Sequence, residues 1–394
     1  MMMPPSPPLP ALAKTGASAL CLLTGLIFGF VAVPQAARGV VVYETSFDAM
    51  SPNVALGGQD GWLQVNGIDS QEVEQYGGDT TNFAWVGENP PETATEVFVF
   101  RPVNVDPVAS SKPIVRFLVN FLVNDSTNGI YDTFSWSLYN QSAELLGSIN
   151  LDLSDLKIYA DDTVDYWDLE VSFGVERWYA LDVLADFERN TWTVYLYDYE
   201  AEEWTTLFTN ELFHAGSSTL NLGDIVLIWI ANDPSGDNRV LFDDYSIRML
   251  NRREAWYAET FELFEDEIDA VKDLDDDGDG FSRDLEFAFG GDPSVADAAE
   301  MPVRASTTTS GADSFLTVSF FRQISNFLGI TYEVEESGML NGAAWPPLPL
   351  PGNEVGIIPF NDFWETVEVR GDRRMTGPGA VPGGFLRVRI VPDP

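Results

Sequence analysis

Aspartate recurs at alternate positions near the start of residues 275–286. A glycine follows these aspartates, and the stretch ends with a glutamate. It reads Asp-Asp-Asp-Gly-Asp-Gly-Phe-Ser-Arg-Asp-Leu-Glu. Calcium takes about six to eight oxygen ligands, so short carboxylates must converge on it, and a glycine must allow a tight turn. A glutamate one helical turn later can bind the ion through both of its oxygens. The spacing therefore predicts a Ca2+ site whose ligands are Asp275, Asp277, Asp279, the backbone carbonyl of Phe281, and Glu286.

Two other interpretations of this stretch stay open. In a second register, Asp273, Asp275, Asp277 and Gly278 take the corresponding places and Asp284 closes the loop. Aspartate is shorter than glutamate and chelates less well at that closing position. The acidic run is also compatible with a solvated turn that binds no ion.

The loop resembles an EF-hand, and residues 255–299 resemble the single helix-loop-helix spacers of secreted bacterial multidomain surface proteins. Those spacers run into a tail like residues 287–297 here, Phe-Ala-Phe-Gly-Gly-Asp-Pro-Ser-Val-Ala-Asp. Two residues depart from the pattern of paired EF-hands. Ser282 replaces an apolar residue, and Arg283, at the ninth loop position, cannot bind a cation. The resemblance therefore implies a solitary, structural hand rather than half of a sensor pair.

The beginning of the chain has the order of a signal peptide. Lys14 precedes the apolar run 17–33, and small residues follow at Ala36 and Ala37. We expect residues 1–37 to be removed on export, which makes the protein secreted, extracellular or bound at the cell surface. The run is barely long enough to span a bilayer, so an uncleaved anchor is the alternative. No second apolar run follows, so no membrane span is expected after signal removal.

The 394 residues carry a formal charge of -41. An acidic surface of this kind repels nucleic acid and anionic membranes, and it favours cations. The single cysteine, Cys21, lies within the predicted signal peptide. The mature chain is therefore expected to lack disulfides, zinc–thiolate sites and a cysteine nucleophile.

Residues 40–250 alternate apolar and polar side chains in short runs separated by Gly, Asn, Asp and Pro, which is typical of an antiparallel sandwich or jelly roll. In the run that follows the turn at 188–190, a period of two places Trp192, Val194 and Leu196 on one face. The pattern predicts a mainly β protein with an N-terminal jelly-roll sandwich. Strands are predicted at 114–123, 133–139, 178–187, 191–197, 225–231 and 240–250.

Residues 40–250 also resemble the concanavalin A-like and laminin G-like jelly rolls and their relatives among carbohydrate-binding modules. Residues 43–48, 58–62, 178–195 and 242–248 carry this resemblance. It implies a carbohydrate or cell-surface partner. In related modules, acidic residues on the first and last strands hold a structural ion, which here implies Glu44, Asp48, Asp243 and Asp244.

The apolar pattern changes to near-helical spacing in residues 252–272, and a second helix is predicted at 283–289, ending at Gly290 with Pro293 just beyond. Together they predict a short helix-loop-helix calcium spacer over residues 251–300. The β pattern returns in residues 305–394, with strands predicted at 315–322, 329–335, 366–370 and 385–391. This last segment is expected to form a small C-terminal β-domain.

Aromatic side chains are the main signal for sugar binding, because the C–H faces of sugars stack on Tyr and Trp rings. Most aromatic residues in strands are core residues, and Trp136 and Trp229 share an apolar face with their neighbours, so both are predicted to be buried. Tyr131, Tyr166 and Trp167 lie in acidic or glycine-containing, loop-like surroundings. These three are the predicted ligand contacts.

A jelly roll can also be a glycosidase, whose chemistry needs two carboxylates facing one sugar. The nearest match to such a pair on one strand is Glu267 with Asp269, but both lie in a predicted helix, so no catalytic residue is assigned. The only histidine, His214, is predicted to lie on the surface. The favoured hypothesis is therefore a noncatalytic, secreted calcium-binding protein for carbohydrate binding or adhesion. The alternatives are an extracellular polysaccharide-degrading hydrolase or lyase, and a purely structural adhesive protein.

Overall fold

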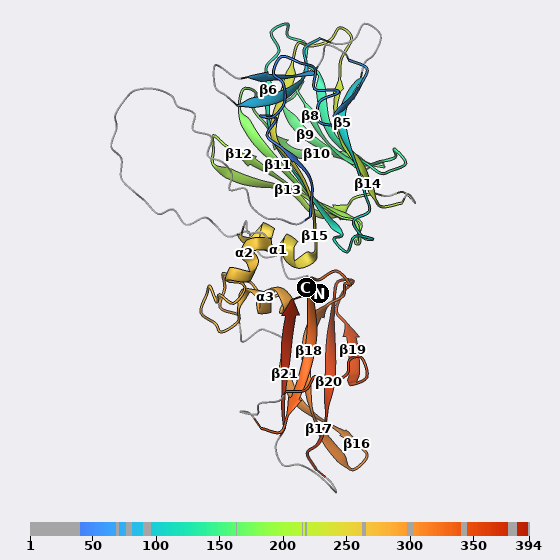
Figure 1. Cartoon of the computed structure of the whole chain (residues 1–394), viewed down its shortest axis with the longest axis vertical. Coiled ribbons are helices and arrows are strands. Elements are labelled where there is room, and N and C mark those ends of the chain that lie inside the picture. The colour runs from blue at the N-terminus through green and yellow to red at the C-terminus, as the bar shows by residue number, and fades with distance from the viewer. Residues whose placement is uncertain are drawn as a thin grey trace, which may run out of the picture. The chain divides into compact units, whose positions relative to one another are not determined.

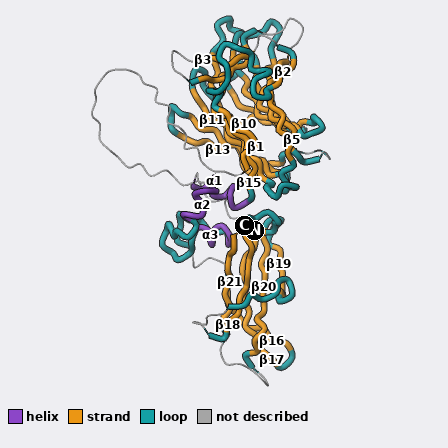
Figure 2. The backbone as a smooth tube through the Cα atoms, viewed as in Figure 1, coloured by secondary structure: helices purple, strands orange, loops and turns teal. Residues whose placement is uncertain are grey.

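The computed structural model describes residues 40–67, 71–75, 81–89, 96–162, 164–214, 216, 219–261, 265–297, 303–339, 345–376 and 384–392. The predicted signal peptide, residues 1–37, lies outside this part. Strands dominate and three short helices occur among the described residues (Figures 1 and 2), so the predicted mainly β fold is confirmed. None of the described helices is both long and apolar enough to cross a membrane.

The chain divides into two compact units, Gly39–Leu250 and a second unit that contains Asn251–Pro394. The first contains the strands β1 (Val40–Thr45), β2 (Leu63–Val65), β3 (Gln71–Gln75), β4 (Asn82–Gly87), β5 (Glu96–Val105), β6 (Ile114–Asn124), β7 (Thr133–Tyr139), β8 (Leu145–Asp152), β9 (Lys157–Asp161), β10 (Tyr166–Ser172), β11 (Trp178–Asp186), β12 (Thr191–Asp198), β13 (Glu203–Leu212), β14 (Leu222–Ile230) and β15 (Arg239–Leu250). The second contains α1 (Arg252–Phe261), α2 (Glu265–Val271), α3 (Arg283–Phe289), β16 (Arg304–Ser310), β17 (Asp313–Gln323), β18 (Ile330–Ser337), β19 (Glu354–Pro359), β20 (Trp364–Arg374) and β21 (Phe385–Pro392).

Two antiparallel sheets form the first unit. The first sheet has the order β13-β12-β11-β6-β15-β4-β3, with β1 also paired to β15. The second sheet has the order β10-β9-β8-β7-β14-β5-β2. Their inner faces pack together: the ring of Trp136 on β7 lies 5.4 Å from Phe117 on β6 and 5.4 Å from Phe242 on β15. The unit is therefore a β-sandwich with one aromatic-rich core.

The alternation of side chains along each strand selects the core residues. Trp192, Val194 and Leu196 on β12 share one face, as predicted from their spacing, and this face is buried in the core. Trp136 and Trp229 are also buried, with 1% and 0% of their surface exposed, which confirms the prediction for both. β11 and β12 form the expected hairpin, in which Asn190 has a φ of 54° that its short polar side chain tolerates.

The second unit joins helices to a β structure. Its strands form one sheet in the order β16-β17-β20-β19 and a separate pair, β18 with β21. Residues 252–272, expected as one helix, contain α1 and α2, and residues 262–264 between them lie outside the described part. Phe287 and Phe289 of α3 share a hydrophobic core with Val318 and Phe320 of β17. The helical segment and the C-terminal strands, which the sequence separated at about residue 300, thus pack into one compact unit.

Candidate functional site

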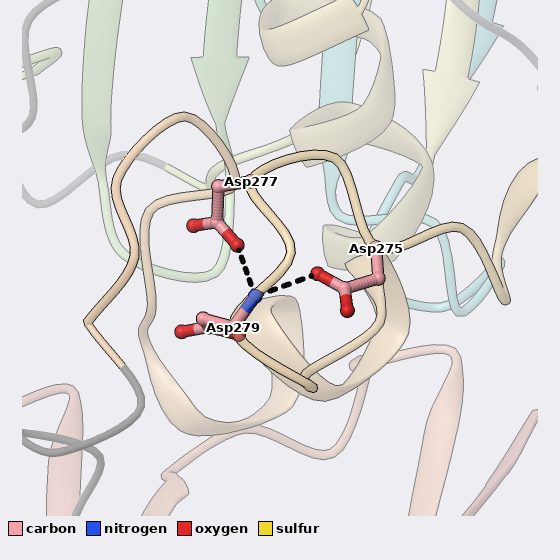
Figure 3. A group of neighbouring side chains, drawn as sticks. All are labelled: Asp275, Asp277 and Asp279. Atoms are coloured by element: carbon pink, nitrogen blue, oxygen red, sulfur yellow. Dashed lines mark hydrogen bonds between the residues drawn. The ribbon is translucent and has the colours of Figure 1, made fainter.

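The three aspartates of the predicted calcium loop converge (Figure 3). One carboxylate oxygen each from Asp275, Asp277 and Asp279 lies within 4.8 Å of the others. Among the described residues, these three form the one cluster of acidic, histidine or cysteine side chains with such close spacing. The loop thus brings together hard oxygen donors of the kind that calcium prefers.

Backbone hydrogen bonds hold the loop in this shape. Asp275 Oδ1 accepts from the N–H groups of Gly278 at 2.9 Å and Asp279 at 3.1 Å, and its Oδ2 accepts from Gly280 at 3.0 Å. Asp277 Oδ1 accepts from the Asp279 N–H at 3.0 Å. Gly278 and Gly280 have φ values of 80° and 99°, which explains why the loop has glycine at both positions. The next residue, Phe281, donates its N–H to Asp279 Oδ1 at 2.8 Å.

Glu286 has the environment that most clearly favours a bound cation. It lies on α3 with only 1% of its surface exposed, and neither carboxylate oxygen has a hydrogen-bond partner in the described part of the chain. Burial, together with the negative charges of Asp277 and Asp279, raises the pKa of Glu286 to about 8. A buried carboxylate without a partner is costly, and a bound cation beside it would remove most of that cost.

Neighbouring charged residues are engaged elsewhere. Arg283 donates to Asp276 through Nε at 2.6 Å and through an Nη at 2.9 Å, so its side chain points to a residue that is not a predicted ligand. Asp284 accepts from Arg253 Nε at 2.8 Å and from the Tyr257 hydroxyl at 2.9 Å. Because these partners already occupy Asp284, the geometry favours the register that Glu286 closes over the one that Asp284 would close.

The predicted sugar contacts have different environments. Tyr166 lies on β10 with 57% of its surface exposed, and its ring stacks on Tyr159 of β9 at 5.0 Å and 13° between planes. Trp167, one residue later, is part of the same strand and not of a loop. Its ring packs against the sandwich core, 6.2 Å from Phe208. Tyr131 is also partly buried against the core.

Polar side chains share the outer face of the second sheet with the tyrosine pair. Tyr159 and Tyr166 lie on the outer face of the second sheet, because Ile158, Ala160 and Trp167 between or beside them contact the core. On the next strands the same face carries small polar side chains that are buried: Ser135 and Ser137 bond to each other at 2.9 Å, and Asn150 donates to Ser148 at 3.2 Å. We call this surface, defined by Ser135, Ser137, Ser148, Asn150, Tyr159 and Tyr166, the tyrosine–serine face.

One further prediction, for His214, is wrong, and another is not tested. His214 is buried, with 5% of its surface exposed, and not on the surface as predicted, because Asn190 anchors its backbone N–H at 3.1 Å and its carbonyl at 2.8 Å. The second ion site implied at Glu44, Asp48, Asp243 and Asp244 stays a prediction, although two of these residues have partners of their own. Glu44 pairs with Arg248 at 2.6 Å, and Asp48 accepts from the Asn82 N–H at 2.8 Å.

Two residues of these sites have no clear signal in the sequence. Tyr159 lies in a short strand between acidic residues, and only the register of β9 with β10 places it beside Tyr166. Asp297 follows α3, and its backbone N–H donates to Asp279 Oδ2 at 3.0 Å. It lies eleven residues beyond Glu286 and outside the loop pattern, although the tail that resembles bacterial spacers includes it.

Comparison with known proteins finds similarity in three-dimensional structure alone. No family model matches the chain, and no curated protein matches its sequence. Among solved structures, a GH131 β-glucanase catalytic domain from Podospora anserina matches with a TM-score of 0.37 and 11% identity, covering 53% of this chain and 96% of that one. Lectin UEA-II in complex with galactose matches with a TM-score of 0.37 and 10% identity, covering 53% of this chain and 98% of the lectin. A sialidase matches with a TM-score of 0.38 and 6% identity, and this chain spans 20% of its length.

Proposed function

We propose that this protein is a secreted calcium-binding protein whose β-sandwich binds carbohydrate without cleaving it. The calcium part is carried by one observation: Glu286 is buried with both carboxylate oxygens unpartnered, and it interacts electrostatically with Asp277 and Asp279 of the converging cluster. A divalent cation is the simplest group that compensates these charges together.

Calcium is favoured over other metals by the donor set. The five predicted ligands offer only oxygen atoms, and no His or Cys side chain is among them. Magnesium demands a near-ideal octahedron and keeps several waters, whereas calcium accepts an irregular loop and a bidentate glutamate. An exported single hand is expected to bind with a Kd of about 10⁻⁴ to 10⁻³ M, in the range of extracellular calcium modules.

Calorimetric titration of residues 38–394 with calcium tests this proposal. We expect heat from one calcium site per chain. Glu286→Gln should bind calcium at least tenfold more weakly. Asp273→Asn removes the same charge outside the preferred register, and it should change the calcium affinity less than twofold. Titration with magnesium should give much weaker binding. No binding of calcium would leave the solvated-turn interpretation, and a larger effect of Asp273→Asn would favour the second register.

The carbohydrate part rests on the tyrosine–serine face. Tyr159 and Tyr166 form a stacked pair of nearly parallel rings, and the more exposed one, Tyr166, is available for a sugar to stack on. Polar groups are arranged beside the rings: Tyr159 donates its hydroxyl to Asp155 Oδ2 at 2.6 Å, and Lys157 pairs with Asp168. Fixed donors and acceptors beside an aromatic platform suit the alternating apolar faces and hydroxyl edges of a sugar.

A glycan array on residues 38–394 tests this part of the proposal. Any glycan that binds should be retained at least tenfold less by Tyr166→Ala and Tyr159→Ala, because these changes remove the stacking platform. Trp204→Ala is the matched control, since Trp204 is a partly exposed aromatic residue on β13 of the first sheet. Equal losses in all three variants would mean that the tyrosine–serine face is not the binding site.

A polysaccharide-degrading enzyme is the second candidate, and one observation favours it. Asp224 on β14 is half-buried next to Tyr139 of β7, and burial raises its pKa to about 6, which is the direction that a general acid needs. Asp168, in contrast, is paired with Lys157, which lowers the pKa of that carboxyl. Each glycan that binds should therefore be incubated with the unmodified protein and with Asp224→Asn. Release of reducing ends by the former and not by the latter would establish the enzyme and overturn the noncatalytic proposal.

A further inference from the structure

The segment that follows α3 turns back to the calcium loop. α3 ends at Gly290, whose φ of 78° reverses the chain, and Gly290 and Gly291 both donate their N–H groups to the Glu286 carbonyl, at 2.7 and 2.9 Å. Asp292 Oδ1 then accepts from the N–H of Ser294 at 2.9 Å, which fixes a turn. The turn brings the backbone N–H of Asp297 within 3.0 Å of Asp279 Oδ2.

The Asp297 side chain lies near the loop acids, and its Oδ2 accepts from the N–H of Asp292 at 3.4 Å. Its Oδ1 is buried and has no hydrogen-bond partner among the described residues, and the same is true of Asp277 Oδ2. Asp297 lies close enough to Asp279 and Asp277 to interact with both electrostatically. Bringing like charges together reduces the stability of the folded chain, and so does burying carboxylate oxygens without hydrogen-bond partners. A shared cation would offset this loss of stability.

The loop itself leaves room for another ligand. At the ninth position, where many such loops supply a ligand through a side chain or a water, Arg283 instead bonds to Asp276, and its guanidinium lies 3.8 Å from the centre of the Phe261 ring. Three monodentate aspartates, one carbonyl and a bidentate glutamate give about six oxygens, at the lower end of what calcium accepts.

We infer that Asp297 is an additional calcium ligand, supplied by the segment after α3 in place of the ninth loop position. The inference rests on the proposed function, because it assigns a further residue to the same ion. It gives residues 290–297 a role as a strap that binds the ion from outside the loop.

Terbium, which substitutes for calcium and reports its own hydration, provides the decisive readout. Luminescence lifetimes in H2O and D2O count the waters bound to the ion, so we expect Asp297→Ala to add about one water relative to the unmodified protein. Calcium affinity, measured by calorimetry on residues 38–394, should fall at least tenfold. Asp273→Asn, which removes one exposed acidic charge near the loop, should leave the water count unchanged.

The outcomes separate this inference from the proposed function. If the unmodified protein binds neither calcium nor terbium, the metal site itself is wrong. If it binds both ions and Asp297→Ala matches Asp273→Asn in affinity and water count, the site stands and Asp297 is not a ligand. Asp297→Asn guards against loss of the fold: it keeps one oxygen donor and the backbone bond to Asp279, so it should bind more tightly than Asp297→Ala.

Discussion

Glu286 should have opposite effects on stability with and without calcium. Without the ion, its buried and unpartnered carboxylate destabilises the second unit, so Glu286→Gln should raise the free energy of unfolding by about 1 to 3 kcal/mol. With millimolar calcium the same change removes a ligand and should lower stability. Urea unfolding of both proteins, in chelator and in calcium, measures the change in the free energy of unfolding under each condition. The same sign under both conditions would contradict a metal role for Glu286.

Asp243 should make the sandwich less stable as the pH rises. Burial and the charge of Asp244 raise the pKa of Asp243 to about 8, so the folded protein holds this proton where the unfolded chain has lost it. Between about pH 4 and pH 8 the folded state therefore binds more protons, and stability falls with increasing pH. Asp243→Asn should flatten this slope and raise stability by on the order of 2 kcal/mol at pH 8, measured by urea unfolding in chelator.

Asp237, in the same unit, should make the sandwich more stable as the pH rises. Hydrogen bonds from Thr127 and Ser126 lower the pKa of Asp237 to about 2, so its contribution to stability is present above pH 4 and is lost as the pH falls toward 2. Asp237→Asn should therefore destabilise the sandwich at pH 7, where Asp243→Asn stabilises it. Equal signs for the two variants at pH 7 would show that burial and hydrogen bonding do not control these carboxyls as described.

At the scale of elements, α3 links the metal loop to the C-terminal strands. Its Phe289 ring packs 6.2 Å from both Phe320 and Tyr332, and the Tyr332 hydroxyl donates to the Ala288 carbonyl at 2.5 Å. Glu286 lies on the same short helix, so the position of this ligand depends on how α3 packs against β17 and β18.

Replacing Phe289 should affect both folding and metal binding. Phe289→Ala should lower the free energy of unfolding by about 3 to 5 kcal/mol through the cavity it leaves, and it should weaken calcium binding because α3 loses its anchor. Phe360, with 58% of its surface exposed after β19, is the matched control, and Phe360→Ala should change neither property by much. Urea unfolding and calorimetric titration measure the pair. A large loss of stability with unchanged calcium affinity would separate the loop from the packing of α3.

At the scale of the whole molecule, the two compact units should respond differently to calcium. The first unit buries a continuous aromatic core in about 210 residues, which is enough to fold without a neighbour. Scanning calorimetry of residues 38–394 should show calcium raising the transition of the second unit alone. Residues 39–250 expressed alone should unfold cooperatively at a temperature that calcium does not change. A single transition that shifts as a whole, or no cooperative transition in the isolated sandwich, would contradict this division.

The sequence by itself determined the features that depend on neighbours along the chain. The spacing of Asp275, Asp277 and Asp279 brings their carboxylates together because a twelve-residue loop with glycine at the sixth position has few ways to fold. β7 and α3 have the predicted bounds, because a strand with period two and a helix that ends at Gly290 are both local patterns. Trp136 and Trp229 are buried as predicted, since apolar neighbours two residues apart mark the inner face.

Other strands carried too little local signal. β16 contains mostly Ser and Thr, and β19 is an edge strand with exposed apolar residues, so neither has the alternation that marks a half-buried strand. Their pairing with β17 and β20 gives them their structure.

Only the tertiary structure decided which side chains are available for function. Tyr166 and Trp167 are adjacent aromatic residues in one acidic stretch, but alternation on β10 turns Trp167 to the core and leaves Tyr166 on the outer face with Tyr159. His214 is buried because Asn190, from a distant turn, holds its backbone. Asp297 meets Asp279 only after α3 and the turn at Gly290 reverse the chain. For His214 and Asp297 the deciding contact joins residues that are separated along the chain, so no local pattern of residue types could determine it.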